Sequence, residues 1–142
     1  MEFQSLKHLR GVGIPELRHS GIIAEKDNLY LVQELLGPTL EDLFNFCERR
    51  FTTKTSLMIF KQMIERLEHV HALGIINRDV KPENIMMGLQ NKSHIVHMID
   101  FGIARSYINK KTGKHIDFQT GKNLVGTARY VSANAHLGYT LS

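Results

Sequence analysis

The chain has 142 residues, of which 42% are hydrophobic and 23% are charged, with a formal net charge of +4; this fits one globular domain and is too apolar for a disordered chain. Its apolar runs are too short to span a membrane, its first residues lack the apolar core of a signal peptide, and its single cysteine excludes an internal disulfide. We therefore expect a protein of a reducing compartment, cytoplasmic or nuclear, with no membrane contact.

The first part of the chain predicts a helix, a β-hairpin and a second, shorter helix. Apolar residues recur at helical spacing over residues 2–10, before a glycine-rich break. Two extended runs, residues 21–24 and 29–34, are separated by a turn-forming Asp-Asn pair, which predicts a hairpin. A Gly-Pro pair ends the second run, and Thr39 is then placed to cap a helix that continues through Phe46.

The longest predicted helix begins at Thr52 or Thr53 and ends near Gly74, because threonine suits an N-cap and glycine suits a C-terminal cap. Its apolar side chains fall on one stripe, which we expect to face the core. That stripe consists of Leu57, Phe60, Ile64, Leu67 and His71, widened by Met63 and Val70.

Two short strands are predicted next, at residues 85–87 and 94–99, with a polar turn between them. From Gly102 onward the sequence is rich in Gly, Lys, Thr and Asn, which predicts loop structure. The chain contains no internal repeat and no linker that would mark a domain boundary. We therefore expect one domain that contains both helices and strands.

The most informative motif lies between the long helix and these strands. Residues 78–84 read Arg-Asp-Val-Lys-Pro-Glu-Asn, and residues 100–102 read Asp-Phe-Gly. Phosphoryl transfer from a metal–nucleotide needs a carboxylate that orients the attacking hydroxyl, a cation near the transferred phosphate, and hard oxygen ligands for magnesium. Each fragment alone is a weak signal, but their order and spacing together are a strong indication of this chemistry.

The order of the predicted elements is that of a protein kinase from the end of its first helix onward, and the sequence resembles the casein kinase 1 family. Residues 35–44 (Leu-Leu-Gly-Pro-Thr-Leu-Glu-Asp-Leu-Phe) resemble the hinge of that family and the short helix after it. Residues 122–130 resemble its substrate-facing segment, and residues 132–138 resemble its departure from the Ala-Pro-Glu motif of most kinases.

The resemblance implies a fold class, α+β with a truncated protein kinase-like fold, in which residues 1–142 form a partial catalytic domain. Residues 1–36 would be the remnant of the N-terminal lobe and the hinge. Residues 37–142 would be the start of the mainly helical C-terminal lobe, with the catalytic and activation loops.

The resemblance also implies a role for each motif residue. Asp79 would orient the substrate hydroxyl, Lys81 would contact the transferring phosphate, and Thr127 would help to fix both. Asn84 and Asp100 would hold Mg²⁺.

Further positions would surround ATP or bind the substrate. The ATP positions are Glu34 and Leu36 at the hinge, Gln33 at the gatekeeper position, Met86 and Ile99 beneath the base, and Asp42 near the ribose. Lys122 and Arg129 match anion-binding positions, and an arginine with a nearby lysine suits a phosphate or a carboxylate.

A kinase of this family would transfer the γ-phosphate of Mg-ATP to serine or threonine of acidic or already phosphorylated proteins, usually as a monomer. The basic stretch over residues 105–129 could also attract nucleic acid or simply be a solvated loop. Aromatic residues are not interleaved with its charges in a stacking pattern, and no nucleic-acid module is recognisable. We therefore expect protein substrates and no nucleic-acid partner.

The sequence departs from the family in its phosphate-binding parts. The Gly11-x-Gly13 pair has Glu16 where a third glycine should be, and Lys26 falls in a hairpin turn, so it does not replace the family's strand lysine. Asn77 stands where a histidine usually precedes Arg-Asp, and we expect it to loosen the metal loop.

These departures lead to the expectation that the chain is the middle of a kinase domain, cut at both ends. Alone it would be inactive or nearly so, with part of the long-helix stripe left as an exposed apolar patch. The alternative from another functional class is a non-catalytic, pseudokinase-like binding module. A third possibility is that the sequence is a piece of a longer protein.

Overall fold

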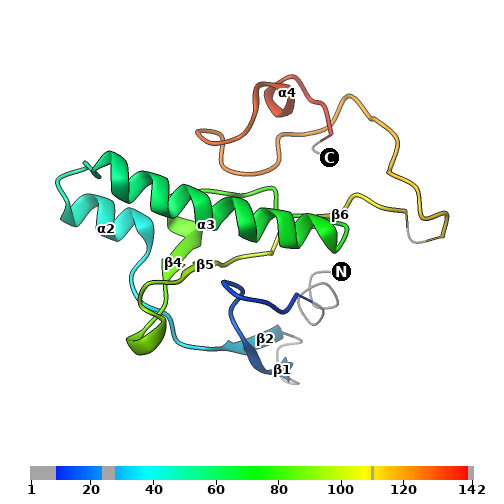
Figure 1. Ribbon diagram of the computed structural model, residues 1–142. Coiled ribbons are helices and arrows are strands. Elements are labelled where there is room, and N and C mark those ends of the chain that lie inside the picture. Colours follow the sequence, from blue (N-terminus) through cyan, green and yellow to red (C-terminus); the bar gives the residue numbers. More distant parts are fainter. Residues whose placement is uncertain (1–8, 24–27, 110, 141–142) are drawn as a thin grey trace.

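The computed structural model describes residues 9–23, 28–109 and 111–140 (Figure 1). The helix predicted over residues 2–10 lies outside the described residues except for Leu9 and Arg10, which are not helical. Leu9 is nevertheless buried in the core. The first residue of the predicted Asp-Asn turn also lies outside the described residues.

The predicted hairpin is present and is longer than expected at its start. Strand β1 (Leu17–Ile23) pairs antiparallel with β2 (Asn28–Gln33), and the register is irregular between Leu17 and His19. The sequence prediction began this strand only at Gly21. The residues just before that glycine are polar and not buried, so they show no apolar pattern that would predict a strand. They belong to the strand because their backbone pairs with β2.

Helix α2 (Leu40–Phe46) begins as predicted, after the Gly37-Pro38 pair. Its N-cap is Thr39, whose hydroxyl accepts a hydrogen bond from the Asp42 backbone N–H at 3.0 Å. The Asp42 carboxylate in turn accepts from the Thr39 backbone N–H at 3.0 Å, which completes a capping box.

Helix α3 (Thr53–Ala72) has the predicted bounds, with Thr52 as N-cap and Gly74 at a positive φ of 74° just beyond its end. The predicted core stripe is only partly right. The buried face carries Met63, Arg66 and Val70, whereas Leu57, Phe60 and Ile64 are 61%, 62% and 48% exposed. Both stripes contain apolar residues, so periodicity alone did not determine which stripe the neighbouring strands would cover.

The exposed apolar patch on α3 is confirmed. Phe60 and Ile64 line an open groove of about 460 Å³ between α2, α3 and the loop that includes Val80 and Pro82. The groove is continuous with the buried core through Met63. Its walls are almost wholly apolar, which is typical of a surface that a partner or a further segment of chain covers.

We predict that Phe60→Ala changes the free energy of unfolding by less than about 1 kcal/mol, because most of this ring is already in contact with water. The variant should also be more soluble, since the exposed apolar area falls. Urea unfolding and a solubility titration measure both effects. A loss of about 3–5 kcal/mol, the value for a buried phenylalanine, would contradict this assignment of the helix faces.

The remaining elements build the base of the site. Strand β3 (Ile75–Ile76) pairs with β6 (Arg105–Ser106), and β4 (Ile85–Met87) pairs antiparallel with β5 (Val96–Met98). Two 3₁₀ turns, η1 (Pro82–Asn84) and η2 (Gln90–Lys92), and a short helix α4 (Ala133–His136) complete the described elements.

Two sequence predictions change here. Strand β5 is shorter than residues 94–99, because the backbone N–H of Ile95 closes the preceding turn on Lys92 at 2.8 Å. The segment after Gly102 is mostly loop, as predicted, but it also contributes β6 and α4.

The core joins residues that precede the β1–β2 hairpin with residues of α2, α3 and the strands β3, β4 and β5, and ends at Phe101. In Figure 1 the β1–β2 hairpin lies on one side of the β4–β5 pair, and helices α2 and α3 lie on the other. The core residues are Leu9, Ile14, Leu40, Met63, Val70, Ile75, Ile85, Val96, Met98 and Phe101. Of the helices in the described part of the chain, none has the length and hydropathy needed to cross a bilayer.

Candidate active site

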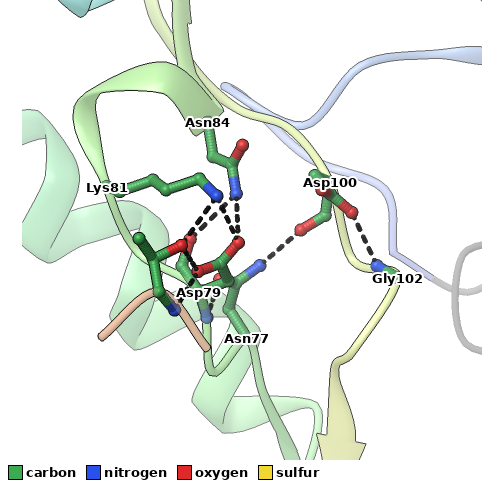
Figure 2. Close-up of polar contacts among 7 residues, drawn as sticks. Asn77, Asp79, Lys81, Asn84, Asp100 and Gly102 are labelled. Carbon is green, nitrogen blue, oxygen red and sulfur yellow. Dashed lines mark hydrogen bonds and ion pairs between the residues drawn. The ribbon is translucent and has the colours of Figure 1, made fainter. Parts of the chain in front are cut away.

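The loop between β3 and β4 contains an uncommon backbone conformation and a 3₁₀ turn. Arg78 has a φ of 71°, an uncommon conformation for a residue with a side chain, and Pro82 starts the turn η1. The backbone N–H of Asn84 donates to the Lys81 carbonyl at 3.0 Å. As a result Asp79, Lys81 and Asn84 all project to one side of the loop (Figure 2).

The Asp79 carboxylate is the centre of this cluster. One of its oxygens accepts hydrogen bonds from the Thr127 backbone N–H at 3.0 Å and from the Thr127 hydroxyl at 2.7 Å. The other oxygen accepts from Lys81 Nζ at 2.8 Å and from Asn84 Nδ2 at 3.0 Å. Lys81 also donates to the Thr127 hydroxyl at 2.8 Å. The structure therefore brings the predicted residues Asp79, Lys81, Asn84 and Thr127 together.

The charges of this cluster are fixed at neutral pH. Burial alone would raise the pKa of Asp79, but hydrogen bonds from Lys81 and Thr127 outweigh it and leave the pKa below its ordinary value. The hydrogen bond to Asp79 raises the pKa of Lys81. An ionised Asp79 is a weak base, but its carboxylate is a strong hydrogen-bond acceptor, so it is suited to orienting a hydroxyl.

Asp100 follows β5 and lies beside the same loop. Its φ of 58° is left-handed, and one carboxylate oxygen accepts from the Gly102 backbone N–H at 2.9 Å. The backbone N–H of Ile99 donates to the Asn84 carbonyl at 2.9 Å, which ties the two segments together. Phe101, which follows Asp100, is buried and anchors the turn, while Asp100 itself is exposed.

Asn84 and Asp100 have the donor chemistry that magnesium prefers. The Asn84 amide nitrogen is committed to Asp79, which leaves its carbonyl oxygen as the ligand atom. The described residues contain no cluster of His, Cys, Asp or Glu large enough to be a metal site by itself. Magnesium fits such a pair nevertheless, because it is usually bound by one or two protein oxygens together with substrate phosphates and water.

Asn77 was expected to loosen this loop, and its observed contacts do not agree with that expectation. Its Oδ1 accepts from the Asp79 backbone N–H at 2.9 Å, and its Nδ2 donates to the Asp100 backbone carbonyl at 2.9 Å. The side chain is 2% exposed. A buried amide with both ends hydrogen bonded stabilises the loop instead of loosening it.

A cavity of about 510 Å³ lies between the segment of residues 31–36 and residues 86 and 99–101 of the β4–β5 region. Most of the residues predicted to surround ATP line it: Gln33, Glu34, Leu36, Met86, Ile99 and Asp100. Its mixed apolar and polar lining suits a planar heterocycle that carries hydrogen-bonding groups. Asp42 does not line this cavity, since its carboxylate caps α2, and its proximity to a ribose stays a prediction.

Glu34 is held in place by contacts that the sequence did not predict. The Glu34 carboxylate accepts from Lys92 Nζ at 2.8 Å and from the Glu16 backbone N–H at 3.2 Å. His97, 2% exposed, places Nε2 at 3.7 Å from the same carboxylate. The hydrogen bond from Lys92 lowers the pKa of Glu34. Nothing in the sequence pattern distinguished Lys92 from an ordinary turn lysine.

A second, smaller cavity of about 240 Å³ lies between Arg78, Arg105 and residues of the 119–140 segment. Its cationic lining comes from Lys122, which the sequence predicted, and from Arg78 and Arg105, which it did not. Burial and then the nearby charge of Arg105 lower the pKa of Arg78. The residues that line this cavity include no carboxylate, so an anion would relieve the repulsion. Arg129, the second predicted anion ligand, is exposed and does not line it.

Comparison of the sequence with known families adds one finding. The family model described as "Protein kinase domain" matches residues 1–137. The matched range contains the hinge, the Asp79 loop, Asp100 and the segment that carries Thr127, so the family match and the observed cluster concern the same part of the chain.

Proposed function

Because the chain belongs to the protein kinase domain family, we propose that it binds Mg-ATP and transfers the γ-phosphate to a serine or threonine hydroxyl of a protein. Protein kinase domains generally use ATP and Mg²⁺ and act on proteins, and the mixed α+β structure is consistent with a truncated kinase-like fold. Membership of the casein kinase 1 family, the choice of serine or threonine and the division at residues 36 and 37 are part of the proposal.

The observation that carries the proposal is the hydrogen-bonded cluster around Asp79. Asp79 would accept the hydrogen bond of the substrate hydroxyl, and Lys81 would offset charge on the transferred phosphoryl group. Asn84 and Asp100 would hold Mg²⁺, and the cavity beside Leu36 and Met86 would take the adenine. The Thr127 hydroxyl is hydrogen bonded to both Asp79 and Lys81 and would keep the two side chains in position.

The proposal places most of the catalytic effect in positioning and electrostatics. The sequence supplies no glycine-rich loop and no strand lysine to hold the triphosphate from above. We therefore propose that the chain alone binds Mg-ATP mainly through its metal ligands and transfers phosphate slowly or not at all. We further propose that it acts as a monomer in the cytoplasm or nucleus.

A thermal-unfolding assay tests the proposal. The midpoint should rise when ATP and Mg²⁺ are added together, because a ligand that binds only the folded state stabilises it. Mg²⁺ with AMP, which lacks the β- and γ-phosphates, is the matched control and should give a smaller shift. The absence of any nucleotide-dependent shift would favour the non-catalytic binding module over the kinase.

We propose that the cavity lined by Arg78, Arg105 and Lys122 selects acidic or phosphorylated substrates, with exposed Arg129 in a secondary role. The supporting observation is the grouping of cations without a carboxylate in the cavity wall. A charged or phosphorylated side chain near the acceptor hydroxyl would be the matching group.

Lys122→Ala is therefore expected to weaken binding of a phosphoserine peptide about fivefold, since Lys122 is exposed and water screens its charge. Binding of the unphosphorylated peptide should change little. Fluorescence anisotropy measures both affinities, and Lys111→Ala, an exposed loop lysine outside the cavity, is the matched control. Equal losses for both peptides would point to a structural role for Lys122.

A further inference from the structure

Asn77 occupies a position between the two carboxylates of the proposed reaction. It follows β3, directly precedes Arg78, and is 2% exposed. Figure 2 shows its side chain directed from the Asp79 loop toward Asp100. The hydrogen bonds from the Asp79 N–H and to the Asp100 carbonyl are both 2.9 Å long. A single side chain thus connects the loop that carries Asp79 with the turn that carries Asp100.

The two backbone segments joined by Asn77 are both strained. Arg78 has a φ of 71° and Asp100 a φ of 58°, and each residue carries a side chain that disfavours this region. Such conformations are unfavourable and persist only when surrounding contacts enforce them. Asn77 bonds to the peptide group that follows Arg78 and to the carbonyl of Asp100 itself, so it contacts both strained sites.

We propose that Asn77 is a positioning residue for phosphoryl transfer, which sets the separation of Asp79 and Asp100 through one donor and one acceptor of a carboxamide. The proposal rests on the proposed function, because it assigns the two carboxylates to the substrate hydroxyl and to magnesium. It departs from the sequence expectation, in which this asparagine weakens the site.

The chemistry of the bridge is specific to an amide. The Asp79 N–H requires an acceptor, and the Asp100 carbonyl requires a donor, so an asparagine satisfies both and an ionised aspartate cannot.

Asn77→Asp changes the donor of this bridge at nearly the same shape. Asparagine donates from its amide nitrogen, whereas an ionised aspartate has only acceptors and places an oxygen against the Asp100 carbonyl.

The loss of this donor should weaken the binding of Mg-ATP. We expect the affinity of Asn77→Asp for Mg-ATP to be at least about tenfold lower than that of wild type, as for loss of a ligand-orienting contact.

The experiment measures unfolding by urea and Mg-ATP affinity by calorimetry at neutral pH for wild type, Asn77→Asp and Asn91→Asp. Asn91 lies exposed in η2 and provides the same chemical change away from the site. Hydrogen exchange at the Asp79 amide gives a second readout in Asn77→Leu, where we expect faster exchange in the absence of nucleotide.

The outcomes separate the bridge from the proposed function. Failure of the wild-type chain to bind Mg-ATP would overturn the proposed function, and unchanged exchange at Asp79 in Asn77→Leu would overturn the bridge. If wild type binds Mg-ATP but Asn77→Asp keeps the same affinity, Asn77 does not position the site. A loss of stability without a change in affinity would likewise overturn the positioning role.

Discussion

The Asp100→Asn variant is expected to bind Mg-ATP roughly 100-fold more weakly than the wild-type chain, at the upper end of the losses seen when a metal site is perturbed. The substitution removes the only formal negative charge of the proposed ligand pair, since Asn84 is neutral. The hydrogen bond from the Gly102 N–H to Oδ1 can be kept by the new amide oxygen, so the turn itself should persist. The lost affinity would then report on the metal contact and not on the fold.

Calorimetric titration with ATP in excess Mg²⁺ measures this difference. Asp117→Asn is the matched control, because Asp117 is an exposed carboxylate in the activation segment and does not line the nucleotide cavity. It changes the net charge by the same amount. An Asp100→Asn affinity within about twofold of wild type would show that Asp100 does not hold the metal.

The Asp79→Asn variant is expected to lose about 2 kcal/mol of unfolding free energy at neutral pH, the range for hydrogen bonds to a charged group. The change leaves Lys81 without its ion-pair partner and places an amide N–H against other donors. The Asp79 and Lys81 side chains are 11% and 20% exposed, and water therefore keeps the loss below that of a fully buried pair.

Acid should reduce the difference between the two proteins. The pKa of Asp79 is lower in the folded protein, so its contribution is present above the unfolded value of about 3.9 and is lost as the pH falls below it. Urea unfolding at about pH 7 and about pH 3 tests this sign. Glu83→Gln, at an exposed carboxylate of the same loop, should show almost no change. A difference that grows with acidity would contradict the assigned charge of Asp79.

The sequence predicted the local parts of the site well because their signals are local. The Thr39 N-cap and the glycine after α3 are fixed by neighbouring residues, and the structure confirms both. The clustering of Asp79 with Thr127 was also expected, although it came from the family resemblance and not from spacing. The Thr127 N–H and hydroxyl both bond to Asp79.

The features that the sequence did not predict depend on contacts between distant segments. Helix α3 has apolar residues on two adjacent stripes, and only packing against β5 determined that Met63 and Val70 would be buried and Phe60 exposed. Arg105 reaches the anion cavity through the pairing of β6 with β3. The ion pair of Lys92 with Glu34 likewise joins the β4–β5 turn to the hinge.

The hydrogen bonds of Asn77 illustrate the same limit within a recognised motif. Asn77 was interpreted as a residue that weakens the Asp79 loop. The sequence shows that the usual histidine is missing, but it does not show which groups the asparagine contacts. The structure supplies a partner for each end of the amide. Substitutions at motif positions are therefore best judged from the hydrogen bonds that the new side chain makes.

The most direct test of the central claim is the location of the nucleotide-bound metal in the wild-type chain. Mn²⁺ can replace Mg²⁺ at oxygen ligands and broadens the NMR signals of nearby nuclei. With ATP present, we expect the strongest broadening at the amides of Asn84 and Asp100, and much weaker broadening at Lys122 and Arg105. Broadening that is absent from Asn84 and Asp100, or that is the same with and without ATP, would contradict the account.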